Sequence, residues 1–199
     1  MIFSVKNCKI TVSFLFFAVL ALFLIEDRSG SALPVFSAAA LHESGHLGAL
    51  RCFGAGLSEI RFTPFGIDMV KSGGTKRSYG KDALISLAGP AANLAAVPLC
   101  LAFPCGTAQK FLLANCVFAG FNLLPVEPLD GGQALYSLLC MKLPENRAAG
   151  VVSVISFAVL TPLAALCFVA LFRSPWNISL LVVSGYLMLL LLLKRERYD

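Results

Sequence analysis

The 199-residue chain is more apolar and less charged than soluble proteins are. Hydrophobic residues make up 58% of it and charged residues 14%, the net charge is +5, and the mean hydropathy is +0.81. Soluble domains are about half apolar and about a quarter charged, so the composition excludes an ordinary soluble domain and indicates a membrane protein. The positive charges form no face interleaved with aromatic residues, and we therefore expect no nucleic-acid partner.

Apolar runs long enough to approach the thickness of a lipid bilayer recur along the chain. We expect membrane helices at about 10–25, 33–53, 82–103, 108–125, 148–172 and 176–193. Because five further runs follow the first, we interpret that run as a membrane helix and not as a cleaved signal sequence. The fourth helix is followed by a broken region at 126–132 and a short apolar helix at 133–141.

The basic residues predict how these helices are oriented. With the N-terminus in the cytoplasm, thirteen of the 16 lysines and arginines lie in cytoplasmic segments, and only Arg28, Lys110 and Arg173 lie outside. Positive charges favour cytoplasmic loops. We therefore expect an integral, multi-pass protein of a bacterial cell membrane, with both termini in the cytoplasm.

The stretch 54–80 is more polar than the runs around it. Within it, Ile60 and Phe62 alternate with Glu59 and Arg61. Alternation of this kind is typical of a half-buried strand. A short hairpin would produce the pattern, and so would an amphipathic loop without strand pairing. The expected fold class is thus an all-α polytopic membrane protein of about six helices with a small β-hairpin-like insertion after the second helix.

The cysteines do not indicate a disulfide framework. There are seven, an odd number, and none forms a CxxC pair. Most lie in or beside apolar runs, where a free thiol behaves as a small hydrophobic side chain. We therefore expect free, buried thiols and no cysteine-based zinc site.

The second apolar run contains the sequence His42-Glu43-Ser44-Gly45-His46. Residues four apart lie on the same face of a helix, so His42 and His46 can offer two imidazole nitrogens to one Zn²⁺. Glu43 follows the first histidine and can accept a proton from an attacking water. An ionisable group at membrane depth is costly and usually marks a functional site. The alternative is a pair of histidines satisfied by hydrogen bonds between helices.

A catalytic zinc usually has three protein ligands and one open position. The best candidate for the third ligand is Asp130, in the broken region at 126–132. Such a break is tolerated at membrane depth where it is buried in protein or lines a wet cavity, and it would present the carboxylate from an irregular turn. Glu127 is the rival ligand. Two prolines and two glycines interrupt the apolar pattern here: Pro125, Pro128, Gly131 and Gly132.

These residues resemble the site-2 protease family of intramembrane zinc metalloproteases, most closely its compact branch, which includes stage IV sporulation protein FB. The matching motifs are His42-Glu43-x-x-His46, Ala88-Gly89-Pro90-Ala91-Ala92-Asn93, Asn122 and Leu129-Asp130-Gly131. They span about 42–132 of the chain. The family's loop more often has an apolar residue or a proline where Glu127 stands.

The resemblance implies roles for six residues. The zinc ligands would be His42, His46 and Asp130, the catalytic residue would be Glu43, and Asn122 and Asn93 would be polar residues of the cleft that contact substrate or the oxyanion. It further implies a single membrane-embedded metalloprotease domain with its core at about 33–141, and we expect neither a PDZ nor a CBS domain.

The predicted function is that of an intramembrane zinc endopeptidase. Its substrate would be a membrane-associated protein or regulatory precursor, such as a pro-sigma or anti-sigma type factor in sporulation, and membrane-bound regulatory partners are compatible with this interpretation. One alternative is a membrane zinc transporter, although transporters often repeat their motifs between two halves. Another is an inactive relative that binds membrane proteins, which would have no use for Glu43.

Overall fold

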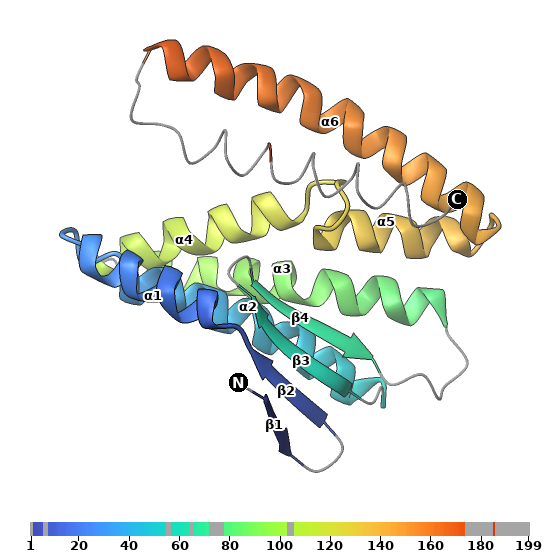
Figure 1. Ribbon diagram of the computed structural model, residues 1–199, viewed down its shortest axis with the longest axis horizontal. Coiled ribbons are helices and arrows are strands. Elements are labelled where there is room, and N and C mark those ends of the chain that lie inside the picture. The colour runs from blue at the N-terminus through green and yellow to red at the C-terminus, as the bar shows by residue number, and fades with distance from the viewer. Residues whose placement is uncertain are drawn as a thin grey trace. The chain divides into compact units, whose positions relative to one another are not determined.

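The computed structural model describes residues 2–5, 8–54, 57–63, 66–71, 78–102, 106–173 and 185 (Figure 1). The chain divides into two compact units. The first comprises Met1–Ser78 and Ala88–Ala119, and the second comprises Tyr79–Leu87 and Gly120–Asp199. In chain order the elements are β1 (Ile2–Val5), β2 (Cys8–Val12), α1 (Phe14–Glu26), α2 (Ala32–Cys52), β3 (Leu57–Thr63), β4 (Gly66–Lys71), α3 (Tyr79–Ala102), α4 (Gly106–Asn122), α5 (Asp130–Cys140) and α6 (Glu145–Arg173).

Five of the predicted helices are confirmed as helices. The ranges 33–53, 82–103, 108–125, 133–141 and 148–172 correspond to α2 through α6, with ends that differ by one to three residues. The predicted span at 176–193 lies outside the described residues apart from Gly185, which is helical.

The prediction of one continuous helix at 10–25 is wrong. Strand β2 runs to Val12, and α1 begins only at Phe14 and has 13 residues. Residues 8–12 combine alternation with β-branched side chains, which favour a strand, whereas the apolar character of the run continues unchanged into the helix. At 13 residues, α1 is shorter than the roughly 20 residues that cross a bilayer.

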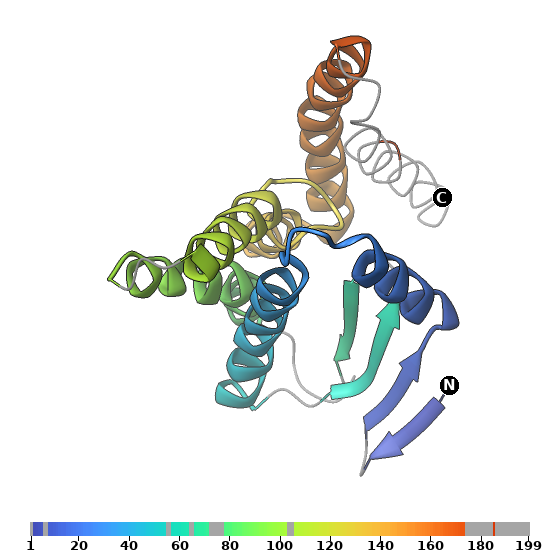
Figure 2. The ribbon, with the colours of Figure 1, turned by 90° about the vertical axis from the view of Figure 1, so that its left-hand side faces the viewer.

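The first unit contains a four-stranded sheet with the order β1-β2-β3-β4 (Figures 1 and 2). The predicted hairpin is confirmed, because β3 and β4 pair antiparallel with Ile60 opposite Met69. Strands β2 and β3 pair in parallel, and α1 and α2 form the long connection that parallel pairing requires. The expected all-α class is corrected accordingly, since the N-terminal strands β1 and β2 extend the hairpin into a larger sheet.

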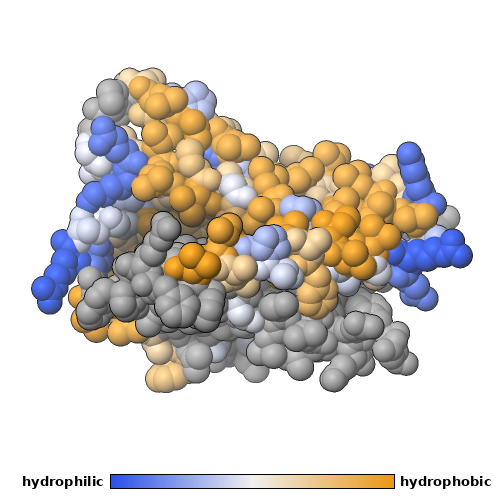
Figure 3. Space-filling model, turned by 90° about the horizontal axis from the view of Figure 1, so that it is seen from above, coloured by the Kyte–Doolittle hydropathy of each residue, from blue (hydrophilic) through white to orange (hydrophobic). Residues whose placement is uncertain are grey.

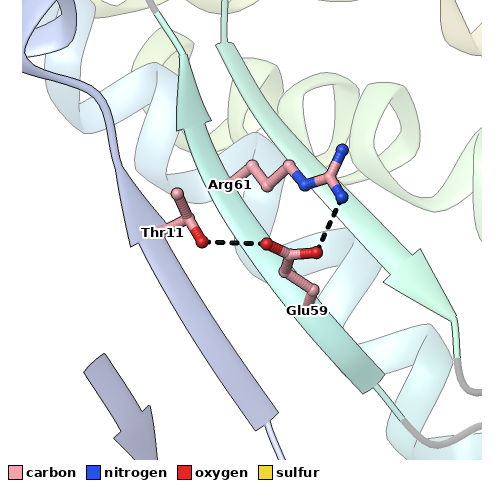
Figure 4. Close-up of polar contacts among 3 residues, drawn as sticks. All are labelled: Thr11, Glu59 and Arg61. Carbon is pink, nitrogen blue, oxygen red and sulfur yellow. Dashed lines mark hydrogen bonds and ion pairs between the residues drawn. The ribbon is translucent and has the colours of Figure 1, made fainter. Parts of the chain in front are cut away.

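A polar cluster joins the two parallel strands (Figure 4). The Glu59 carboxylate on β3 accepts a hydrogen bond from Thr11 Oγ1 on β2 at 2.8 Å and one from Arg61 Nη2 at 2.8 Å. These contacts, the one from Arg61 first and that from Thr11 second, lower the pKa of Glu59 from 4.5 to about 2. The ionised carboxylate therefore helps to hold the N-terminal hairpin on the rest of the sheet.

We predict that this attachment weakens in acid. Because the pKa of Glu59 is lowered by folding, its stabilisation is present above about 4.5 and is lost as the pH falls towards about 2. Hydrogen exchange of the β2 amides should be faster in Glu59→Gln than in the wild type at neutral pH, and this difference should shrink as the pH falls through that window. A difference that is independent of pH would contradict this role of the carboxylate.

The start of α2 is held by a capping aspartate. Both carboxylate oxygens of Asp27 accept backbone N–H groups, with Ser31 N at 3.0 Å on Oδ1 and Ala32 N at 2.7 Å on Oδ2. These bonds, led by that from Ala32, lower the pKa of Asp27 to about 2. They also satisfy N–H groups that the first turn of a helix otherwise leaves without intrahelical partners. The helix that carries His42 and His46 therefore has a defined beginning.

In the second unit, the segment between α4 and α5 packs against α6. Val126 and Leu160 are both fully buried and form the centre of an apolar cluster. The partly buried residues around them come from the end of α4, from the segment after it and from α6: Phe121, Leu124, Leu129, Phe157, Val159 and Leu163. This cluster fixes the segment that leads into Asp130.

Within the described ranges, two helices are long and apolar enough to cross a membrane. They are Tyr79–Ala102, which is α3, and Glu145–Leu166, the larger part of α6. Large apolar side chains are also exposed on several other helices, including Ile25, Leu33 and Leu113. Figure 3 shows that hydrophobic residues cover much of the coloured surface on one face. Exposed apolar surface of this extent is typical of a protein that contacts lipid or a partner. The remaining predicted spans keep the status of a prediction.

Candidate metal centre

Helix α2 brings the two histidines together as the sequence spacing predicts. His42 Nε2 and His46 Nε2 are 3.2 Å apart, and the two rings meet edge to face with an angle of 79° between their planes. The His42 side chain is buried and that of His46 is half-buried. Two imidazole nitrogens thus converge on one point beside the helix.

The separation of these nitrogens fits a shared metal ion. Two zinc–nitrogen bonds of about 2.0–2.1 Å at a tetrahedral angle place the nitrogens about 3.3 Å apart. The observed distance is 3.2 Å. Without an ion, a single proton between the two nitrogens would satisfy both, whereas a metal would use both lone pairs.

Two glycines allow α3 to approach this pair. A Cβ atom on Gly89 would lie 2.3 Å from His46 Nε2 and 2.8 Å from His42 Nε2, and one on Gly45 would lie 2.4 Å from the carbonyl oxygen of Ala88. Real Cβ atoms do not come so close. Glycine at 89 therefore keeps the space beside both imidazoles free of side chains, and glycine at 45 lets the backbones of α2 and α3 come close together.

His42 is held from its other side by Asn93 of α3. His42 Nδ1 lies 2.6 Å from Asn93 Oδ1, and Asn93 is completely buried. The amide nitrogen of Asn93 donates to the carbonyl oxygen of Ala38 at 2.9 Å and to Asn115 Oδ1 at 2.8 Å. The sequence predicts Asn93 as a polar residue of the cleft, and its hydrogen bonds place it behind His42. A direct contact of Asn93 with substrate stays a prediction.

Asn115 on α4 is the residue that sequence reasoning missed. It is fully buried, and its amide nitrogen donates to the carbonyl oxygen of Phe111 at 2.8 Å. A polar amide within an otherwise apolar helix is a signal of an interhelical hydrogen bond. The sequence contains that signal, but nothing in the spacing of Asn93 and Asn115 identifies them as partners.

Asp130 belongs to the second unit and is the first residue of α5. The predicted irregular turn around it is thus partly corrected, since Asp130, Gly131 and Gly132 are helical. A Cβ on Gly131 would lie 2.4 Å from the carbonyl oxygen of Leu123, and one on Gly132 would lie 2.5 Å from that of Val126. The two glycines do not end a helix here. They let the first turn of α5 pack on the preceding segment.

Further contacts fix the segment before Asp130. The backbone N–H of Glu127 donates to Ser156 Oγ of α6 at 2.9 Å, and the N–H of Leu129 donates to the carbonyl oxygen of Val126 at 2.7 Å. The Asp130 carboxylate has a buried Oδ2 atom and lies at a helix N-terminus, where the helix dipole favours negative charge. Asp130 therefore has a defined position within its own unit.

The other predicted site residues are located as follows. Glu43 is half-buried on α2 beside His42, Asn122 is half-buried at the end of α4, and Glu127 is half-buried in the segment before α5. His42 and His46 in the first unit and Asp130 in the second each offer one ligand atom of a kind that binds metal ions.

We predict that Gly89→Ala lowers metal affinity, because the added methyl group would overlap both Nε2 atoms. The matched control is Gly80→Ala in the same helix, where a Cβ would meet no described atom within 4 Å beyond its own helical neighbours. Competition with a chromophoric chelator measures the dissociation constant. Equal constants for the two alanine variants would show that the space beside the imidazoles does not matter.

We predict that Gly132→Ala destabilises the second unit by roughly 1–3 kcal/mol, the typical cost of overpacking, because its methyl group would overlap the backbone of Val126. Gly150→Ala in α6 serves as the control, since among the described residues its Cβ has open space. Thermal unfolding in detergent compares the two variants. The prediction fails if both unfold at the same temperature.

Comparison with known proteins relates this arrangement to a solved fold. No family model matches the sequence, and no curated protein does. Among solved structures, the chain is similar to the site-2 protease from Methanocaldococcus jannaschii, with a TM-score of 0.64 and 20% sequence identity over 94% of this chain and 91% of that one. The protein therefore has the fold of a site-2 protease.

Proposed function

We propose that the protein is an intramembrane zinc metalloprotease of the site-2 protease family. The observation that carries the proposal is the pair of imidazole nitrogens 3.2 Å apart on α2, with Glu43 next to the first of them in the chain. The similarity in fold to a site-2 protease and the apolar helices support it independently.

In this proposal His42, His46 and Asp130 hold the metal. Two imidazoles and one carboxylate are a usual donor set for catalytic zinc, with a fourth position open. When bound, the ion supplies a Lewis acid that activates water and polarises the scissile carbonyl group. The chain itself contributes the orientation of each ligand. Asn93 orients His42, and the packed first turn of α5 orients Asp130.

Glu43 is proposed as the general base and acid. It follows His42 on the same helix, so it can take a proton from the attacking water and pass it to the leaving amine. Asn122, at the end of α4, is proposed to donate an amide hydrogen bond to the substrate backbone or to the developing oxyanion.

The proposed substrate is a membrane-tethered protein, such as the regulatory precursor that the sporulation branch suggests. A transmembrane helix shields its own carbonyl groups, so its cleavage requires an extended segment. Strand β4 is the last strand of the sheet, with β3 on one side, and its other edge is proposed to pair with such a segment. With both termini cytoplasmic, this edge and the metal centre would lie towards the cytoplasmic side.

We predict that Glu43→Gln reduces cleavage of a single-span reporter in proteoliposomes by a factor of about 100 or more while the purified protein keeps its zinc. His42→Gln should lose both zinc and cleavage, and Ser44→Ala, at an exposed neighbouring position, should keep both.

Two results would contradict this account. Cleavage by the Glu43→Gln variant at the wild-type rate would remove Glu43 from its role. Zinc flux across the membrane, without cleavage of any reporter in a panel of single-span proteins, would favour a transporter instead.

A further inference from the structure

Two asparagines form a buried chain of hydrogen bonds behind the metal centre. Asn93 on α3 and Asn115 on α4 are both completely buried among apolar helices. Buried amides almost always have hydrogen-bond partners, and these two are partners of each other. The chain starts at a backbone carbonyl and ends at His42.

The orientation of both amides is determined by backbone carbonyl groups, which can only accept. Asn115 must direct its nitrogen at the carbonyl oxygen of Phe111, 2.8 Å away, so its Oδ1 faces Asn93. Asn93 Nδ2 donates to that oxygen at 2.8 Å and to the carbonyl oxygen of Ala38 at 2.9 Å. Turning either amide over would place two oxygens or two amide nitrogens against each other.

This orientation selects the tautomer of His42. With both amide hydrogens used, Asn93 presents only its Oδ1 to His42 Nδ1, at 2.6 Å. Because that oxygen accepts, Nδ1 must carry the proton. A neutral imidazole has one ring proton, so Nε2 keeps a lone pair, and this nitrogen is the one that faces His46.

We propose that Asn93 and Asn115 are positioning residues that hold His42 in the Nδ1–H tautomer and thereby set the affinity of the centre for its metal. The affinity claim rests on the proposed metal site, whereas the tautomer claim does not require a metal. Asn115 acts through Asn93, and Asn93 acts through His42.

Removal of the Asn93 amide would reverse the tautomer preference of His42. With leucine at 93, Nδ1 of His42 would face an apolar group, and the ring proton would move to Nε2, where His46 Nε2 at 3.2 Å can accept it. Binding of a metal through Nε2 would then require the proton to return to Nδ1, where it would have no acceptor. Mutation of a hydrogen-bond partner of a metal-binding histidine typically lowers the metal affinity by about 10–100-fold. We expect a loss of that size for Asn93→Leu and a smaller one for Asn115→Leu.

The tautomer can be measured directly, because the chain has two histidines. Full-length, metal-free protein labelled with ¹⁵N-histidine, at a pH of about 8, above the reference pKa of free histidine, should show a protonated Nδ1 and an unprotonated Nε2 at His42. A His46→Gln variant assigns the signals. Asn93→Leu should shift the proton to Nε2, whereas Asn93→Asp, which keeps an acceptor at Nδ1, should retain the wild-type pattern.

Zinc affinity of the same variants provides the second measurement. Thr161→Val is the control, since it removes a hydrogen bond within α6 and should change neither the tautomer nor the affinity.

A wild-type His42 protonated at Nε2, or an Asn93→Leu variant with wild-type tautomer and affinity, would overturn the proposal. If Asn93→Leu does not fold, the tautomer and the zinc affinity of Asn115→Leu and Asn93→Asp test the proposal instead. Wild-type protein that binds no zinc would refute the proposed function, and the tautomer would still decide the role of the asparagines.

Discussion

The hydrogen bond between Asn93 and His42 is the interaction on which the proposed metal centre depends. A buried imidazole that binds a metal through one nitrogen needs a partner for the other, since an unsatisfied buried polar group costs roughly 1–3 kcal/mol. Asn93 meets this need and is itself satisfied by Ala38 and Asn115. Three helices, α2, α3 and α4, are thereby tied together by side chains that also orient the His42 imidazole.

Close packing at glycines is the second constraint, and it acts in each unit separately. Gly45 and Gly89 let α3 approach the two imidazoles, while Gly131 and Gly132 let the first turn of α5 lie on the segment before it. In both cases a single methyl group would collide with an imidazole or with backbone atoms. The motifs around these glycines therefore contain polar site residues together with glycines that close packing requires. Hydrogen bonds and apolar contacts, such as those of Val126, then fix the positions of the packed segments.

Much of this arrangement could be predicted from the sequence, because the strongest signals are local. The pair His42 and His46 follows from helical spacing, and the hairpin of β3 and β4 follows from alternation. The N-terminal strands could not be separated from α1, because one apolar run covers both. The partnership of Asn93 and Asn115 depends on how two helices pack, which no local pattern records. The pattern around Gly131 and Gly132 predicts a break in the helix, because their packing role involves contacts that the sequence does not show.

The coordination of the bound metal tests the central claim most directly. X-ray absorption spectroscopy of the zinc-loaded, full-length protein should show one zinc per chain with two imidazole nitrogens and oxygen donors at about 2.0–2.2 Å. The Asp130→Asn variant should lose zinc or change the oxygen shell. A sulfur scatterer at about 2.3 Å, or a spectrum with no imidazole contribution, would show that zinc binds elsewhere and would contradict the account.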